Sequence, residues 1–280
     1  MKRNDQKISI NQKLKNIAQK KDIIFSLVIT EFLIERLLVR ILSDQNLNNS
    51  LIFKGGYVGL RVYNSPRYTV DLDALLLNAN LRGTLDKIKL IAVQDIGDCV
   101  WFAFEDEINL QTQGEYGGVR LVFRSGIGEP FTNIKKGQVI HFDLGIGDPV
   151  IPGPSKHQIQ ELIGGANLSW QVYPIETIIA EKLHALVSRG EASSRSKDIF
   201  DLCYYLPSAN SNLLKNSLKA CFDYRQTQLP TNMAEVIKKI DLTILRKGWP
   251  NATANIQNVP SCDDAFALLI YLLQDVLLER

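Results

Sequence analysis

The hydrophobic pattern of the sequence changes from helical to strand-like and back again, and this order limits the folds that the chain can adopt. Residues 10–43 carry apolar side chains at helical spacing, whereas residues 51–150 contain the strand-like segments. From Pro174 onward the spacing is helical to the end of the chain. Strand signals that stay together and are followed by helices favour an α+β fold over repeated βαβ units. We therefore expect a mixed or antiparallel sheet with helices in residues 1–160 and a helical domain in residues 161–280.

The strand signals are short segments that alternate apolar and polar side chains or are rich in β-branched and aromatic residues. They are residues 70–76, 101–110, 118–126 and 139–146. Glycine and proline are frequent in residues 147–156, and both this segment and residues 164–170 are predicted to be irregular. Pro174 suits the first turn of a helix, and the C-terminal helix has Ser261 or Asp263 as its predicted N-cap.

The most apolar stretch, Ile23 to Leu42, is expected to be a helix that packs against the rest of its domain. It contains four charged residues, Glu31, Glu35, Arg36 and Arg40. Four charges within a length that could span a bilayer argue against a transmembrane helix. Because these side chains fall largely on one side at helical spacing, we expect them to form a solvated stripe.

Charge, cysteine usage and the N-terminal residues exclude several classes of protein. The formal net charge is +2, so a nucleic-acid surface would have to be a local basic patch. The four cysteines form no C-x-x-C pair, which argues against a structural zinc site and a disulfide framework. The N-terminus lacks the apolar core of a signal peptide. We expect a soluble cytoplasmic protein that does not insert into a membrane.

A pair of glycines follows a short apolar segment, at a point where a strand or turn gives way to a helix. Gly55 and Gly56 follow Lys54 there, and adjacent glycines let the backbone approach a ligand closely. The start of a helix adds partial positive charge, which suits a phosphate group. The two glycines are therefore candidate phosphate-binding residues, although a Gly-Gly turn also fits a purely structural role.

Two aspartates, Asp71 and Asp73, lie in the next strand-like segment with Leu72 between them. Alternate residues of a strand point to the same side, so both carboxylates face one way. Two like charges on one face repel each other, and a bridging cation relieves this repulsion. Oxygen ligands suit Mg²⁺ or Mn²⁺, which bind through a few carboxylates plus substrate phosphates. The alternative interpretation is an exposed polar face on an edge strand.

A third carboxylate stands on the polar side of the predicted strand at residues 139–146. Asp143 alternates there with apolar side chains, and it could complete a metal-binding triad with Asp71 and Asp73. Such a triad holds two metal ions roughly 4 Å apart. Asp148 is the rival third ligand, but it lies in a Gly-Asp-Pro turn, where aspartate is common for local reasons.

Charged residues on two of the C-terminal helices form a further set of candidates. Lys182 lies near the apolar face of its helix, where a lysine either extends to solvent or meets an anion. Asp198 and Asp201 share a face of the next helix at i, i+3 spacing. The loop between the helices is flanked by basic residues that suit either phosphate binding or a solvated loop. They are Arg189, Arg195 and Lys197.

The segment GGYVGLRVYNSPRYTVDLDALL resembles the AbiEii toxin family, whose members read approximately GG-T-A-L-R, a few residues, then R-[FY]-[ST]-x-D-[LI]-D. The residues at matching places are Gly55, Gly56, Leu60, Arg61, Arg67, Tyr68, Thr69, Asp71 and Asp73. Tyr57 and Val58 replace the usual Thr and Ala. The segment PIETIIAEKLHALVSRGEASSRSKDIFDLCYYL is similar to the family's E-K-L-x-A-L helix, basic loop and [RK]-D-x-x-D-L helix.

This resemblance implies a nucleotidyltransferase fold of the DNA polymerase β type and transfer of a nucleoside monophosphate from an NTP with Mg²⁺ or Mn²⁺. The implied metal ligands are Asp71, Asp73 and Asp143. The implied catalytic residues are these three together with Lys182 and Asp198, with Asp201 in a structural role. The implied nucleotide-binding residues are Gly55, Gly56, Arg67, Thr69 and Lys182.

The same resemblance implies the acceptor and the biological setting. The expected acceptor is the 3′ end of tRNA, and the expected role is that of the toxin in a type IV toxin–antitoxin or abortive-infection system for phage defence. The expected partner is a DNA-binding antitoxin encoded nearby. Two other functions remain open: transfer of AMP to a protein hydroxyl, and a non-catalytic module that binds a nucleotide or RNA.

Overall fold

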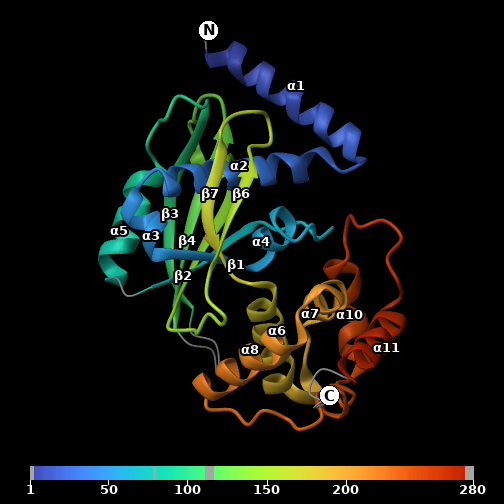
Figure 1. Ribbon diagram of the computed structural model, residues 1–280. Coiled ribbons are helices and arrows are strands. Elements are labelled where there is room, and N and C mark those ends of the chain that lie inside the picture. The colour runs from blue at the N-terminus through green and yellow to red at the C-terminus, as the bar shows by residue number, and fades with distance from the viewer. Residues whose placement is uncertain (1–2, 78–79, 111–116, 275–280) are drawn as a thin grey trace. The chain divides into compact units, whose positions relative to one another are not determined.

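The computed structural model describes residues 3–77, 80–110 and 117–274, and the chain divides into two compact units. The first unit consists of Met1–Val62, Tyr68–Gly147 and Lys156–Val172. The second unit consists of Tyr63–Arg67, Asp148–Ser155 and Tyr173–Arg280. The first unit contains the sheet and the second is built from helices (Figure 1). The α+β class predicted from the sequence is confirmed.

The first unit combines helices with one mixed sheet. Its helices are α1 (Arg3–Lys21), α2 (Phe25–Leu42), α3 (Gln45–Ser50), α4 (Gly55–Arg61) and α5 (Leu81–Ala92). Its strands are β1 (Leu51–Lys54), β2 (Asp71–Leu76), β3 (Val100–Leu110), β4 (Gly118–Ile127), β5 (Gln138–Ile146), β6 (Ser155–Gln160) and β7 (Asn167–Val172). The strand order is β3-β4-β5-β2-β1-β7-β6, with β2 parallel to β5 and β1 parallel to β7.

The second unit is helical along most of its described length. Its helices are α6 (Ile175–Arg189), α7 (Ser196–Tyr205), α8 (Ser211–Tyr224), α9 (Met233–Ile237), α10 (Leu242–Ala252) and α11 (Cys262–Leu273). Pro174 stands immediately before α6, as its fixed backbone angle favours. The Ser261 hydroxyl caps α11 by accepting from the Asp264 backbone N–H at 3.1 Å, so Ser261 is the predicted N-cap that the structure uses.

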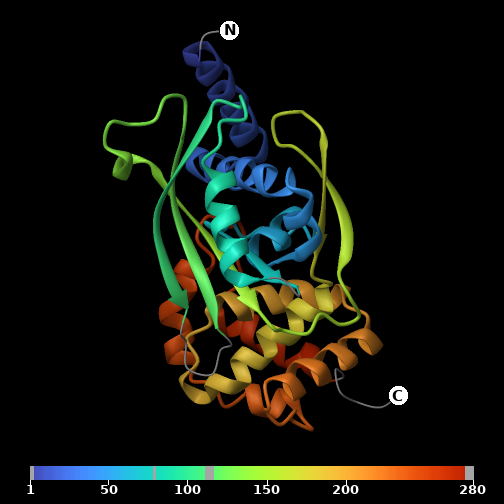
Figure 2. The same cartoon turned by 90° about the vertical axis from the view of Figure 1, so that its left-hand side faces the viewer.

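The two faces of the central strands differ in chemistry because their side chains alternate. Leu72 and Ala74 of β2 are fully buried beside Phe142 and Leu144, their register partners on β5. Helices α2 and α5 pack together against the sheet (Figure 2), and α2 contacts β5 and β7. The apolar face therefore forms the core of the first unit. The residues between those apolar positions point to the opposite face of the sheet.

Three elements differ from the sequence-based expectation. Strand β7 occupies residues 167–170 of the second segment predicted to be irregular, β6 overlaps the first only at residues 155–156, and α5 lies between strands where no helix was predicted. Trp170 and Val172 are buried at alternate positions of β7, so a strand pattern is present but short. In α5, Leu85, Ile88 and Ile91 are buried at helical spacing behind an N-cap at Asn80. The two short strands carry too little periodicity to be distinguished from loops, whereas the helical spacing of α5 is present in the sequence and was missed.

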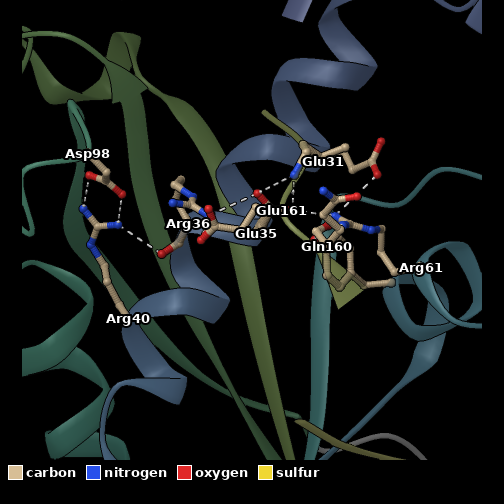
Figure 3. A network of polar contacts seen from close by, with 10 residues as sticks. Glu31, Glu35, Arg36, Arg40, Arg61, Asp98, Gln160 and Glu161 are labelled. Atoms are coloured by element: carbon tan, nitrogen blue, oxygen red, sulfur yellow. Dashed lines mark hydrogen bonds and ion pairs between the residues drawn. The ribbon is translucent and has the colours of Figure 1, made fainter. Parts of the chain in front are cut away.

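The charges of α2 are buried rather than solvated, which corrects the prediction of a solvated stripe. Glu35 and Arg40 are completely buried, and Glu31 and Arg36 nearly so. Arg40 donates to both oxygens of Asp98, at 2.7 and 2.9 Å, and to backbone carbonyls (Figure 3). A charge can be buried when ion pairs and hydrogen bonds replace its water, and these partners come from distant parts of the chain.

The other charges of α2 join it to α4 and to the segment after β6. Arg61 of α4 donates to Glu35 at 2.8 Å and to the Gln160 carbonyl oxygen at 2.6 Å. Arg36 pairs with Glu161 at 2.8 Å (Figure 3). Burial raises the pKa of Glu31, an effect that nearby cations reduce. Together with the Arg40–Asp98 pair, these contacts hold three chain segments against α2: the residues around Asp98, helix α4 and the segment after β6.

None of the helices in the described part of the chain combines the length and the hydropathy needed to span a bilayer.

We expect the Arg40→Met substitution to lower the free energy of unfolding by about 3–5 kcal/mol, because it leaves Asp98 half-buried without its partner. Urea denaturation of the purified protein measures this loss. The matched control is Arg82→Met, since Arg82 pairs with Asp86 on the exposed surface of α5. Its loss should stay within about 1 kcal/mol. Equal losses in the two variants would show that the buried network does not hold α2 in place.

Candidate active site

The sheet brings the predicted carboxylates together on one face. Strands β2 and β5 run parallel, and their register places Asp73 opposite Asp143 and Asp71 opposite His141. Strand β4 runs antiparallel to β5 and places Arg120 opposite Asp143. Side chains at paired positions point to the same side of a sheet. We call these five side chains the acid face.

Asp143 and Asp71 of the acid face contact Arg120 and His141. Arg120 donates from Nε and Nη2 to the two oxygens of Asp143, at 2.7 and 2.6 Å. Its Nη2 also lies 4.0 Å from Asp71 Oδ1. His141 Nδ1 is 2.7 Å from the same Asp71 oxygen. The hydrogen bond to Asp143 raises the pKa of Arg120, so the guanidinium is held charged.

Neither Arg120 nor His141 was predicted as a site residue. Arg120 alternates with the apolar residues Val119 and Leu121 in its strand, so its position on a polar face was readable from the sequence. Which carboxylate it would meet was not readable, because that depends on the register between β4 and β5.

The start of α4 lies directly against this face, which explains the two glycines. A Cβ atom on Gly55 would stand 2.1 Å from Asp73 Oδ2, and Gly55 has φ +72°, a backbone conformation that favours glycine. A Cβ atom on Gly56 would stand 3.0 Å from Thr69 Cβ. Lys54 ends β1 opposite Asp73. The glycines therefore allow a close approach to Asp73 and Thr69, while their predicted contact with phosphate stays a prediction.

Thr69 lies two residues before β2 and forms a hydrogen bond with its first residue. The Asp71 backbone N–H donates to the Thr69 hydroxyl at 3.2 Å, which orders the residues just before the first aspartate. The Thr69 hydroxyl donates to the Asp71 carbonyl oxygen at 3.4 Å, so its one proton would have to leave this long bond to reach a ligand oxygen. The role of Thr69 in holding a phosphate is compatible with this geometry and stays a prediction.

The oxygen donors of the acid face fit a divalent cation only in part. Asp71 and Asp73 leave one face of β2 at alternate positions, and one or two carboxylates are what Mg²⁺ uses beside substrate phosphates. Both oxygens of Asp143 accept a hydrogen bond from Arg120, so a metal ion at Asp143 would bring a second positive charge against the same carboxylate. Consistent with this, the described part of the chain contains no cluster of three or more His, Cys, Asp or Glu residues arranged to hold a metal ion.

The second unit holds its own charge cluster on α6 and α7. Lys182 Nζ lies 2.6 Å from Asp198 and 2.8 Å from Asp201. Arg67 donates from Nε and Nη2 to the two oxygens of Asp201, at 2.9 and 2.7 Å. Asp198 is also 3.2 Å from Arg195. The shared face predicted for the two aspartates is thus found, and both carboxylates face the same lysine.

Burial and charge act in opposite directions on this cluster. Burial disfavours the charged ammonium of Lys182, but Asp198 and Asp201 outweigh burial and raise its pKa. Burial also disfavours the charged carboxylate of Asp201, but Lys182 and Arg67 outweigh it and lower its pKa. Both shifts favour the charged forms of Lys182 and Asp201. The roles predicted for Lys182, Asp198 and Arg67 toward a nucleotide stay predictions.

Asp148, the rival third carboxylate, lies in the second unit and is engaged there. Arg225 Nη2 donates to Asp148 Oδ1 at 2.9 Å. Asp143 is the candidate that lies opposite Asp73 in the sheet. In the basic loop, Arg189 and Lys197 are exposed, whereas Arg195 is half-buried beside Asp198.

Comparison with known proteins identifies the family of this chain. The family model described as "Nucleotidyl transferase AbiEii toxin, Type IV TA system" matches residues 36–267. The chain belongs to the AbiEii family. This AbiEii-family protein is therefore a nucleotidyltransferase-type toxin of a type IV toxin–antitoxin system, and the family implies an antitoxin partner. None of the curated proteins compared matches the chain.

Two solved structures share the fold of this AbiEii-family protein. One is a candidate nucleotidyltransferase of H. pylori, with a TM-score of 0.54 and 16% identity, covering 90% of this chain and 95% of the other. The second is JHP933 of Helicobacter pylori, with a TM-score of 0.53 and 16% identity, covering 91% of this chain and 93% of the other. Identity this low shows the fold alone, and it confirms the predicted nucleotidyltransferase fold.

We expect the stability effect of Asp201→Asn to depend on pH. At pH 7 the variant should lose about 3–5 kcal/mol of unfolding free energy, because buried Arg67 then faces a neutral amide and Lys182 keeps only Asp198 as a charged partner. The folded-state pKa of Asp201 lies below its unfolded value of about 3.9. Its contribution is therefore complete above about pH 4 and is lost as the pH falls through the folded pKa.

Urea denaturation at several pH values from 3 to 7 measures the gap between the wild-type protein and the Asp201→Asn variant. The gap should be widest near neutral pH and should narrow below about pH 4. Asp86→Asn, which alters an exposed carboxylate, serves as the control and should show a small effect throughout. A gap for Asp201→Asn that stays constant over this range would contradict the assignment.

Proposed function

We propose that this AbiEii-family protein transfers a nucleoside monophosphate from an NTP to an acceptor hydroxyl, and that the acid face carries the reaction. The observation that supports this most directly is the position of Gly55 against Asp73, which lies two residues after Asp71 on β2. Gly55 has no side chain, so a phosphate chain can approach the backbone there closely. The carboxylates of Asp71 and Asp73 lie beside it and can bind the metal ion that the phosphates carry. Family membership supplies the reaction class.

Asp71 and Asp73 would hold a Mg²⁺ ion, which supplies positive charge for the phosphate oxygens and orients the phosphate chain. In the reaction the acceptor oxygen bonds to the α-phosphorus while the bond from that phosphorus to the bridging oxygen breaks. Pyrophosphate and the hydroxyl proton leave. The protein contributes positioning and charge rather than covalent chemistry.

A nucleic-acid acceptor is favoured by the surface of α1 in the first unit. Residues 6–21 of this helix contain no acidic residue. Its exposed basic side chains are Lys13, Lys15, Lys20 and Lys21. Lysines on one exposed helix neutralise phosphates and bind nucleic acid largely without regard to sequence. Because the net charge of the chain is only +2, binding of nucleic acid needs a local basic surface, and these lysines supply one.

A hollow at the turn between α1 and α2 continues the same surface. It has a volume of about 330 Å³ and is lined by Lys15, Ala18, Gln19, Asp22, Ile23 and Phe25. An aromatic ring, an amide and an ammonium group are the side chains with which proteins contact unpaired bases and the RNA backbone. We therefore propose RNA as the acceptor class and, from the family resemblance, the 3′ end of tRNA as the acceptor.

We expect Asp73→Asn to reduce transfer of label from α-³²P-labelled NTPs to total tRNA by at least about 100-fold, because the amide keeps the shape of the side chain but loses its charge. The assay contains Mg²⁺ and tests each NTP separately. Asp86→Asn is the matched control, since Asp86 lies on the exposed surface of α5. Its rate should equal that of the wild-type protein.

The distribution of label separates the alternatives. Label on tRNA from the wild-type protein but not from Asp73→Asn supports the proposal. Label that survives nuclease but is released by protease would show that the acceptor is a protein hydroxyl and not tRNA. If the protein binds NTP but releases no pyrophosphate with any acceptor tested, the proposed transfer reaction is wrong. The protein would then be a non-catalytic nucleotide-binding module.

We expect that replacing Lys13, Lys15, Lys20 and Lys21 together with Gln raises the KM for tRNA roughly tenfold or more and leaves the KM for NTP unchanged. Each lost phosphate contact should also flatten the dependence of binding on salt. Kinetics at several salt concentrations measure both effects.

The control removes the same charge from the second unit, through Gln at four exposed lysines. These are Lys219, Lys238, Lys239 and Lys247. This control should keep the wild-type KM for tRNA and the wild-type salt dependence. An equal effect in both variants would mean that net charge, rather than α1, attracts the RNA.

A further inference from the structure

Arg120 is a basic residue built into the acid face. It lies on β4 directly opposite Asp143 on β5, so two paired strands fix its place. Its Nε and Nη2 donate to separate oxygens of Asp143, at 2.7 and 2.6 Å, and Nη2 lies 4.0 Å from Asp71. One guanidinium is therefore paired with one candidate metal ligand and lies close to a second.

A divalent cation and a bidentate arginine compete for the same carboxylate. Both require its oxygens, and both are positively charged, so they repel each other when they meet at one group. The Arg120 and Asp143 side chains are only 29% and 16% exposed, and the paired geometry is the strong, two-bond form. The pair is therefore firmer than an exposed ion pair, and a cation that bound Asp143 would have to approach against the positive charge of Arg120 or displace its two hydrogen bonds.

The positive charge that the reacting phosphate needs can come from Arg120 instead of a second metal ion. Two-metal sites place positive charge on both sides of the reacting phosphate. A guanidinium also supplies positive charge to phosphate oxygens and binds them as it binds a carboxylate. It carries five N–H donors, and Asp143 accepts from Nε and Nη2, so donors remain for a second anion.

We propose that Arg120 replaces one metal ion of a two-metal site, so that the protein binds a single divalent cation through Asp71 and Asp73. This inference rests on the proposed function. Arg120 stays paired with Asp143 when the NTP binds and donates to one of its phosphate oxygens. Asp143 then acts as the positioning residue that orients Arg120, rather than as a ligand of the metal.

The test counts Mn²⁺ ions bound per chain by electron paramagnetic resonance in the presence of α,β-methylene NTP analogues. The methylene group prevents release of pyrophosphate, so the count does not depend on turnover. The wild-type protein should bind one Mn²⁺ per chain. Arg120→Ala should bind two, because Asp143 then becomes available to a cation. Arg120→Lys keeps the positive charge and should bind one.

Arg124→Ala is the matched control. Arg124 lies on the same strand and donates from Nε and Nη2 to the two oxygens of Glu105, at 2.6 and 3.1 Å. This variant loses an arginine–carboxylate pair outside the acid face and should still bind one Mn²⁺ per chain. Circular dichroism verifies that each variant is folded before ions are counted.

Two bound Mn²⁺ ions in the wild-type protein would overturn the inference even if Arg120→Ala failed to fold, because a second ion would have displaced the arginine. A single ion in folded Arg120→Ala would overturn it as well. These results leave the proposed transfer reaction intact. No bound Mn²⁺ in any variant would overturn the proposed metal-dependent reaction together with this inference.

Discussion

Repulsion between carboxylates on one side of a sheet is the constraint on which the first unit depends. Asp71, Asp73 and Asp143 share a face because β2 and β5 run parallel in register. The same register places His141 against Asp71, and the antiparallel neighbour places Arg120 against Asp143. The polar partners of Asp71 and Asp143 therefore stand on strands and not on loops. A slip of β5 by one residue would send its carboxylate into the core and an apolar side chain onto the acid face.

The buried charges of α2 are connected to the acid face through helix α4. Arg61 at the end of α4 is held by Glu35 of α2, while Gly55 at the start of α4 lies against Asp73. One short helix thus joins the buried network to the site, and its two ends are fixed by different kinds of contact. A buried network of charges is costly unless every member is paired, so it tolerates few alternative packings. That property suits a helix whose first residue must stay within contact distance of a carboxylate.

Local patterns made part of this structure predictable. The fold class and the shared face of Asp71 and Asp73 follow from periodicity, which a single segment carries within itself. The pairing of Arg120 with Asp143 could not be predicted, because their meeting depends on strand register. The four charges of α2 were misjudged for the same reason, since their partners lie far away in the sequence. Short strands are a separate case: β7 buries Trp170, but its few residues resemble a loop when read alone.

The two charge clusters of the protein differ in their contact with water, and this difference bears on what each can do. Asp201 is 1% exposed and satisfies both Arg67 and Lys182, so a ligand that reached it would have to break buried ion pairs. On the acid face the Asp71 and Arg120 side chains are 33% and 29% exposed, so a ligand there first displaces water. The Arg67–Asp201 pair therefore contributes to the packing of the second unit, while the predicted role of Arg67 toward a nucleotide stays a prediction. The acid face, by contrast, keeps charge at the surface, where binding a phosphate costs the fold no internal contact.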